Sequence, residues 1–370
     1  MKLMAWSKMQ TAIIVGAVVL LAAGTTAVTI EKIISPRPFV RIDGTGQIVL
    51  YSGVKSLVVE TARMTILTDG KSYRISLVSK GRGTLTNDIY DVTTDYGCDG
   101  TDLFEVSDRL SPLHRTHEGI GGFAYPERFP GGFFGDHEFP PTVVQAAWLA
   151  YCSRDYLNIP TNQTGLPLMG IGFSPAPDYI TNQVTYWTNS TLPQRITGWS
   201  RNWIIADRTN SLQPMQAIEL PQYPGGFKAW QFTATDPVTI ENIQVPRQVT
   251  LETFFPKPPN TATTGDETLL LRKATFIADS IEIGKGKLDP LPPVPIPDLE
   301  VADSRFQDVA ATFVITSHAT PKGWPTRGSP TFQQADAFAH KLASDNPADI
   351  ASSLKTLNPT VIPPSTLKIK

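Results

Sequence analysis

The feature that most constrains the fold is a strict alternation of polar and apolar residues beside two Asp-Gly pairs. In residues 72–77 every second side chain is apolar, and a period of two buries one face of a strand and leaves the other in water. Asp69-Gly70 precedes this run, and Asp99-Gly100 follows the next one. Asp-Gly supplies the positive φ angles that hairpin turns need. Residues 38–110 are therefore predicted to form an antiparallel meander.

Runs of β-branched and aromatic residues continue the strand pattern through residues 161–290. The strand candidates are 47–51, 56–61, 63–68, 72–79, 90–98, 103–106, 184–188, 199–206, 216–220, 227–235, 239–243, 249–255, 267–283 and 311–317.

Two segments interrupt the strands. Gly119 to Gly135 holds six glycines and four phenylalanines without a regular period, which predicts an ordered loop or flap. Pro140-Pro141-Thr142 then opens a predicted helix from Val143 to Leu157, because proline suits the first turn of a helix. Two short helices are predicted near the C-terminus, at 332–342 and 346–357.

These patterns predict a mainly β protein with minor α: a large curved antiparallel sheet, half-barrel-like, packed with a few helices. The domain expected at 31–288 is this sheet with the helix near 143–157. Residues 299–370 are expected to add a strand and two short helices that pack on it. Residues 289–298 read Asp-Pro-Leu-Pro-Pro-Val-Pro-Ile-Pro-Asp, which favours an extended polyproline connector or a proline-rich edge wrapped on the body.

The N-terminus predicts export from the cytoplasm. Lys2 and Lys8 precede twenty uncharged residues, Thr11 to Ile30, which as a helix span about 30 Å, the thickness of a bilayer core. Residues 1–30 are thus expected to be a cleaved signal peptide or a transmembrane anchor, with a buried core helix as a third interpretation. The protein is expected in the cell envelope: anchored in the inner membrane and facing the periplasm, or periplasmic or secreted after cleavage.

The charge balance excludes one class of partner. Removing Lys2 and Lys8 from the formal net charge of −2 leaves −4 on residues 31–370, and no run of Lys or Arg interrupts them. Nucleic-acid binding needs a concentrated positive footprint, so none is expected. The partners expected are the membrane, through residues 1–30 if they are retained, and a lipid or other apolar ligand.

Three histidines are the candidate metal ligands. His114 and His117 lie close together in sequence, and His137 follows between two acidic residues. Imidazoles and carboxylates bind zinc, and three ligands leave one position open to activate water. The spacing is not that of a helix-borne His-Glu-x-x-His site, and the alternative is solvated loop histidines. No Gly-x-Ser-x-Gly turn occurs, so no catalytic residue and no cofactor are assigned.

The chain contains two cysteines, Cys98 and Cys152. In an oxidising compartment they would form one disulfide, closing a loop of about 55 residues and stabilising the fold by roughly 3–5 kcal/mol. The alternative is two buried thiols that pack as small hydrophobes.

The chain carries two resemblances to known proteins. Lys8 to Thr26 resembles the membrane segment of certain bacterial sigma-factor-like and exported proteins of unknown function, which implies insertion into a membrane. Met64 to Val106 and Phe227 to Phe255 resemble the meander of outer-membrane lipoprotein-carrier proteins. That resemblance implies a strongly curved sheet, closed on its open side by helices, that holds acyl chains.

The function expected is non-enzymatic: binding of a lipid or other apolar ligand, or an interaction module of the envelope. The aromatic residues between 186 and 230 either line a cavity for such a ligand or fill an ordinary β core. One alternative is an exported metal-dependent hydrolase that uses His114, His117 and His137. Another is a purely structural envelope protein.

Overall fold

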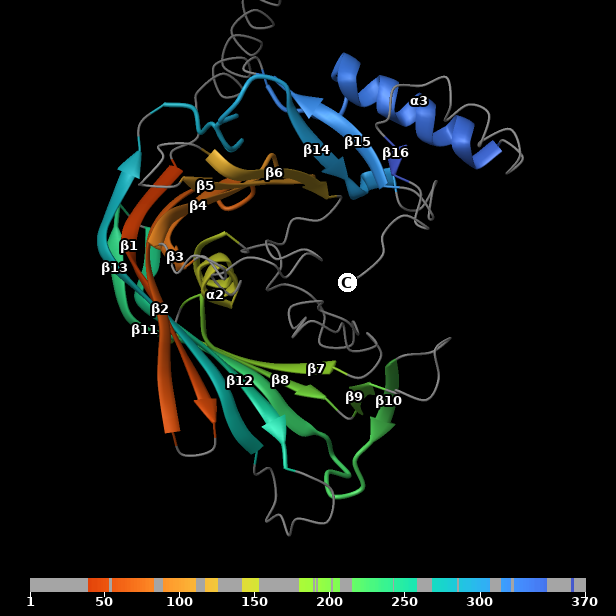
Figure 1. Cartoon of the computed structure of the whole chain (residues 1–370). Coiled ribbons are helices and arrows are strands. Elements are labelled where there is room, and N and C mark those ends of the chain that lie inside the picture. The colour runs from red at the N-terminus through yellow and green to blue at the C-terminus, as the bar shows by residue number, and fades with distance from the viewer. Residues whose placement is uncertain are drawn as a thin grey trace, which may run out of the picture.

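The computed structural model shows one large sheet that bends round a short helix, α2 (Thr142–Tyr151) (Figure 1). The structure describes residues 39–52, 55–82, 89–110, 117–125, 142–152, 180–188, 190, 192–200, 202–206, 215–241, 243–257, 268–284, 286–306, 314–320, 323–344 and 361–362. The predicted fold class, mainly β with a large curved and mostly antiparallel sheet and few helices, is confirmed.

The first half of the chain supplies six strands of the sheet. They are β1 (Phe39–Ser52), β2 (Lys55–Thr68), β3 (Tyr73–Arg82), β4 (Ile89–Cys98), β5 (Leu103–Leu110) and β6 (His117–Tyr125).

The strands that follow α2 are β7 (Ile180–Tyr186), β8 (Pro193–Ser200), β9 (Asn202–Ala206), β10 (Met215–Glu219), β11 (Phe227–Ile240), β12 (Ile243–Pro256), β13 (Thr268–Gly284), β14 (Leu299–Asp303), β15 (Val314–Ala319) and β16 (Val361–Ile362). Two further helices are the short 3₁₀ helix η4 (Ser304–Phe306) and α3 (Pro330–Ser344).

Fourteen described strands form the large sheet, in the order β16-β15-β14-β6-β5-β4-β3-β2-β1-β13-β12-β11-β8-β7. Strands β9 and β10 form a separate pair. Every pairing described in the large sheet is antiparallel except that of β14 with β6. Strand β1 joins the two halves, because it pairs with β2 on one side and with β13 on the other.

The predicted Asp-Gly turns are confirmed at the β2–β3 and β4–β5 connections. Gly70 and Gly100 have φ angles of 87° and 97°, which cost a glycine little. In the first turn, Asp69 Oδ1 accepts hydrogen bonds from the backbone N–H groups of Lys71 and Ser72, at 2.9 and 2.7 Å. Asp99 closes the second turn in the same way.

Register shifts accompany the curvature of the sheet. The pairing of β1 with β13 shifts at Asp43/Gly44, that of β12 with β13 at Thr253/Phe254, and that of β11 with β8 at Lys228/Trp230. An extra residue in one strand bends it locally and increases its twist. Strands β1, β12 and β13, which carry two of these shifts, bend round α2 (Figure 1).

The proline-rich segment packs against the convex face of the sheet. Leu291, Val294 and Ile296 contact a buried cluster around Phe104 and Trp324. The indole N–H of Trp324 donates to the Pro292 carbonyl oxygen, at 2.7 Å.

Several boundaries differ from the sequence prediction. Strand β6 occupies part of the predicted Gly/Phe flap. Its sequence has no alternation of polar and apolar residues, and the strand forms because its backbone pairs with β5. The strand predicted at 239–243 is instead the tip of the β11–β12 hairpin, where Glu241 has a φ of 47°. The strand predicted at 199–206 divides between β8 and β9.

The segments predicted at 1–30, 153–157 and 346–357 lie outside the described residues. Within the part that the structure describes, the helices are too short or too polar to cross a membrane.

Candidate functional site

The concave face of the sheet is lined by rows of apolar side chains that cross from strand to strand. Residues directly opposite one another in neighbouring strands point to the same face. One row crosses six strands through Ile48, Ala274, Leu251, Phe232, Ile196 and Val184. A second row crosses the other half through Ile281, Ile42, Ile66, Ile75, Tyr96, Glu105 and Phe123. The apolar members belong to one cluster or pack against it, so the face is one continuous apolar surface.

Helix α2 lies on this face and is buried on all sides, from Val143 to Tyr151. A helix that is apolar all round is a core helix rather than a surface one. It packs against β12, β13 and β1. Gly46 permits the close approach, because a Cβ at this position would lie 2.7 Å from Val143 Cγ2.

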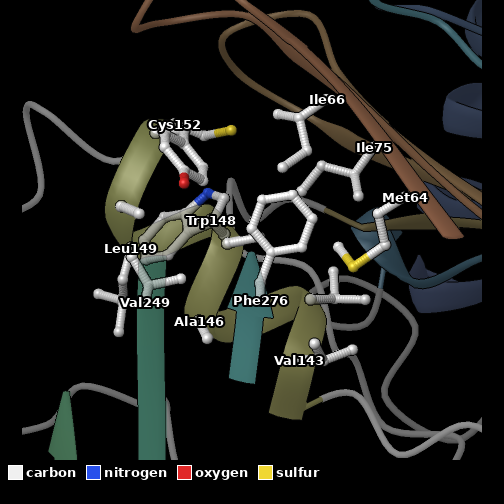
Figure 2. Close-up of a cluster of buried hydrophobic side chains, with 14 of the residues drawn as sticks. Met64, Ile66, Ile75, Val143, Ala146, Trp148, Leu149, Cys152, Val249 and Phe276 are labelled. Carbon is white, nitrogen blue, oxygen red and sulfur yellow. The ribbon is translucent and has the colours of Figure 1, made fainter. Parts of the chain in front are cut away.

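The cluster beneath α2 is tightly enclosed. In Figure 2, Trp148 of the helix lies beside Phe276 of β13, with Ile75 and Met64 on the other side of that ring. The Tyr151 ring meets Phe276 edge-on, with 5.9 Å between centroids, and its hydroxyl donates to the Pro246 carbonyl oxygen at 2.8 Å. Tyr151 thereby fixes the helix to β12 and β13.

Three ionisable side chains of this cluster have raised pKa values. Burial raises the pKa of the Tyr73 and Tyr151 hydroxyls and of the Cys152 thiol, because each charged form would lose its hydration. All three groups are therefore neutral near pH 7.

Polar side chains also reach the concave face. In β4 and β5, Thr94 and Ser107 lie with their hydroxyl oxygens 3.4 Å apart, and Glu105 beside them is 1% exposed. In β12 and β13, Thr253 lies directly opposite Arg272. Thr253 and Arg272 were not among the candidates from sequence. Arg272 precedes the buried Ala274 and Phe276 by two and four residues in the same strand. The alternation of the sequence therefore predicts that its side chain lies on the same face as theirs.

The histidines proposed as metal ligands are only in part within the described chain. His117 begins β6, whereas His114 and His137 lie outside the described residues. Among the side chains that the structure describes, no three His, Cys, Asp or Glu residues gather closely enough to hold a metal ion. The metal site stays a prediction.

The cysteines are buried thiols, and the predicted disulfide between them is not formed. Cys98 ends β4, and Cys152 follows α2 directly. Both belong to the main apolar cluster, and the Cys152 thiol lies near the Thr68 side chain. They act as small hydrophobes, as in the alternative interpretation of the sequence.

Comparisons with known proteins show only distant structural similarity. No protein-family model matches the chain, and no curated protein sequence matches it. A LolA superfamily protein from Nitrosomonas europaea is similar with 10% identity and a TM-score of 0.29, over 70% of this chain and 89% of that one. A DUF1329 family protein from Desulfovibrio piger is similar with 10% identity and a TM-score of 0.27, over 71% and 92% of the two chains.

A β-barrel-like DUF1849 domain from Brucella abortus is similar with 8% identity and a TM-score of 0.23, over 68% of this chain and 99% of that one. The likeness of this chain to lipoprotein-carrier sheets is thus a distant one, at the level of a large β-sheet.

Proposed function

We propose that this chain is a non-enzymatic binding protein for an apolar ligand, such as the acyl chain of a lipid, which lies along the concave face of the sheet. The observation that carries the proposal is the six-strand apolar row from Ile48 to Val184. An acyl chain is long, narrow and apolar, so a row that crosses many strands matches its shape. Its burial there is favourable at roughly 0.8 kcal/mol per methylene group.

Helix α2 does not extend over the apolar row from Ile48 to Val184, which lies beyond the N-terminal end of the helix. Val143, at its N-terminal end, packs over Gly46, and Cys152 at the other end reaches Thr68. Ile48 and Ala274 lie one row past Gly46, on the side away from Thr68. Because Ile48 and Phe232 are buried in the structure, ligand entry requires this face to open.

We expect the protein to act in the cell envelope, on the basis of the apolar segment predicted in residues 1–30. Lipids are abundant there, and a protein held at or near a membrane meets acyl chains at high local concentration.

Tryptophan quenching by an acyl chain brominated near its middle tests the proposal. Trp230 lies on the concave face opposite Gly198, whereas Trp199 follows Gly198 and points to the other face. The brominated chain is expected to quench the protein's fluorescence, and Trp230→Phe is expected to remove more of that quenching than Trp199→Phe. Lipid extracted from the purified protein should contain acyl chains at about one ligand per chain.

Absence of both quenching and extractable acyl chains would leave the purely structural role. Equal effects of the two substitutions would place the ligand away from the concave face. Zinc at one ion per chain, without bound lipid, would support the hydrolase instead.

A further inference from the structure

Three polar side chains form a row across β11, β12 and β13 at one edge of the apolar surface. Trp230 lies opposite Thr253, and Thr253 lies opposite Arg272. Two residues further along each strand stand Phe232, Leu251 and Ala274, which form the apolar row described above. Side chains two apart share a face, so the polar row also lies on the concave face.

Thr253 and Trp230 carry buried polar groups without a hydrogen-bond partner among the described residues. Thr253 is 2% exposed, and its Oγ1 makes no hydrogen bond with any described residue. Trp230 is 1% exposed, and its indole N–H donates no hydrogen bond to any described residue. Buried polar groups are normally satisfied, so two orphans on neighbouring strands call for an explanation, such as a ligand that supplies the missing partner.

Gly198 determines where the Trp230 indole lies. A Cβ on Gly198 would overlap Nε1 and come within 2.6 Å of Cδ1, so the ring rests on the bare backbone of β8. Strands β8 and β12 flank β11 on opposite sides. The indole thus leans away from Thr253 and leaves the Thr253 hydroxyl beside Arg272.

Arg272 brings positive charge to this row. Arg272 is partly buried, and this burial lowers the pKa of its guanidinium. The neighbouring Lys273 points to the opposite face, where its Nζ lies 3.7 Å from Glu252 Oε1. A guanidinium and a hydroxyl side by side donate hydrogen bonds well to the oxygens of a carboxylate or a phosphate.

We infer that the concave face binds an amphiphile whose oxyanion head, a carboxylate or a phosphate ester, accepts hydrogen bonds from Thr253 and Arg272. Its chain then lies along the apolar row through Ala274, Leu251 and Phe232. The Trp230 indole forms the side wall of the head-group site on β11. This inference rests on the proposed function and adds the chemistry of the head group.

Binding of a matched set of twelve-carbon ligands tests the inference: dodecyl phosphate, dodecanoic acid, dodecanol and dodecyltrimethylammonium, each kept below its aggregation concentration. The wild-type chain is expected to bind the two anions about tenfold or more tightly than the alcohol, because hydrogen bonds to charged groups are the strong ones. Arg272→Met should remove about tenfold from the affinity for the anions and leave dodecanol binding unchanged. Thr253→Val should cause a smaller loss, again for the anions alone.

Lys273→Met is the matched control, because it removes the same charge from the next residue on the opposite face. It should leave all four affinities unchanged, and circular dichroism should show that every variant keeps its β content. Equal loss in Lys273→Met and Arg272→Met would overturn the head-group site in favour of long-range electrostatics. Inorganic phosphate that binds as tightly as dodecyl phosphate would overturn the lipid head group as the source of the oxyanion.

The two proposals fail in different ways. Equal affinity for the anions and for dodecanol would sink the oxyanion site and leave apolar binding intact. No binding of any of the four ligands would refute the proposed function and this inference together.

Discussion

At the scale of the residue, the packing of the proline-rich segment depends on the absence of one side chain. Gly97 of β4 lies on the convex face, opposite Phe104 of β5. A Cβ there would overlap the Pro290 carbonyl oxygen and lie 2.6 Å from Pro292 Cδ. Glycine is required at this position for close approach of two backbones rather than for an unusual φ angle.

Gly97→Ala is expected to lower the free energy of unfolding by about 1–3 kcal/mol, because the segment must shift to accommodate the new methyl group. Urea denaturation, analysed by linear extrapolation, measures the loss. Gly225→Ala is the control, since a Cβ there meets nothing within 4 Å. A loss as large in Gly225→Ala as in Gly97→Ala would show that the packing of this segment is not the cause.

At the scale of the element, one buried carboxylate joins the β4–β5 turn to the C-terminal part of the sheet. Asp102 follows that turn and is fully buried. Arg305 Nη1 of η4 donates to Asp102 Oδ2 at 3.0 Å, and Arg327 Nη2 donates to Asp102 Oδ1 at 2.9 Å. Arg305 also forms an ion pair with Asp303. Burial alone would lower the pKa of the Arg305 guanidinium, but the Asp303 and Asp102 carboxylates outweigh this effect and raise it. This network of Asp102, Asp303, Arg305 and Arg327 includes Asp303 of β14, which lies opposite Ala124 in the parallel pairing with β6.

Asp102→Asn is expected to destabilise the protein by about 3–5 kcal/mol, because it leaves the buried Arg305 and the half-exposed Arg327 facing a neutral amide. Thermal unfolding measures the loss, and hydrogen exchange should show earlier opening of β14 than of β3. Asp91→Asn breaks the Lys80–Asp91 ion pair, whose side chains are 67% and 43% exposed, and is expected to cost less than about 1 kcal/mol. Comparable losses in the two variants would contradict a structural role for the network.

At the scale of the whole molecule, the curved sheet and α2 enclose several groups that cannot ionise in place. Tyr73, Tyr151 and Cys152 come from β3, from α2 and from the residue after it, yet they belong to one apolar cluster. Burial raises the pKa of each. Their ionisation is therefore coupled to opening of the core as a unit.

The free energy of unfolding is expected to fall as the pH rises above about 9. In the unfolded chain cysteine and tyrosine lose protons near pH 8.5 and 10, whereas the folded core retains them. Stability from these groups is thus fully present below about pH 8.5 and is lost progressively above it. Urea denaturation between pH 7 and 11 measures the slope, and Cys152→Ala should flatten its first part. A slope that is flat or rising over this range would contradict the burial of these groups.

Much of the local structure follows from short stretches of sequence. The alternation in residues 72–77 predicts which side chains of β3 are buried, and the Asp-Gly pairs predict the turns on either side of it. The helix start at Thr142 follows from the two preceding prolines. Strand β14 was not predicted, because five residues carry too little periodicity, and β6 was missed because its glycines pair only once β5 is in place.

The sequence by itself determined the two Asp-Gly hairpins and the buried face of β3, because both depend on backbone preferences and side-chain polarity within a few residues. Only the tertiary structure decided that β13 pairs with β1, that β14 runs parallel to β6, and that Thr253 lies beside Arg272. Those arrangements depend on contacts between residues far apart in the chain, whose free energy no local pattern records. The candidate head-group site therefore became visible only when the strands were placed side by side.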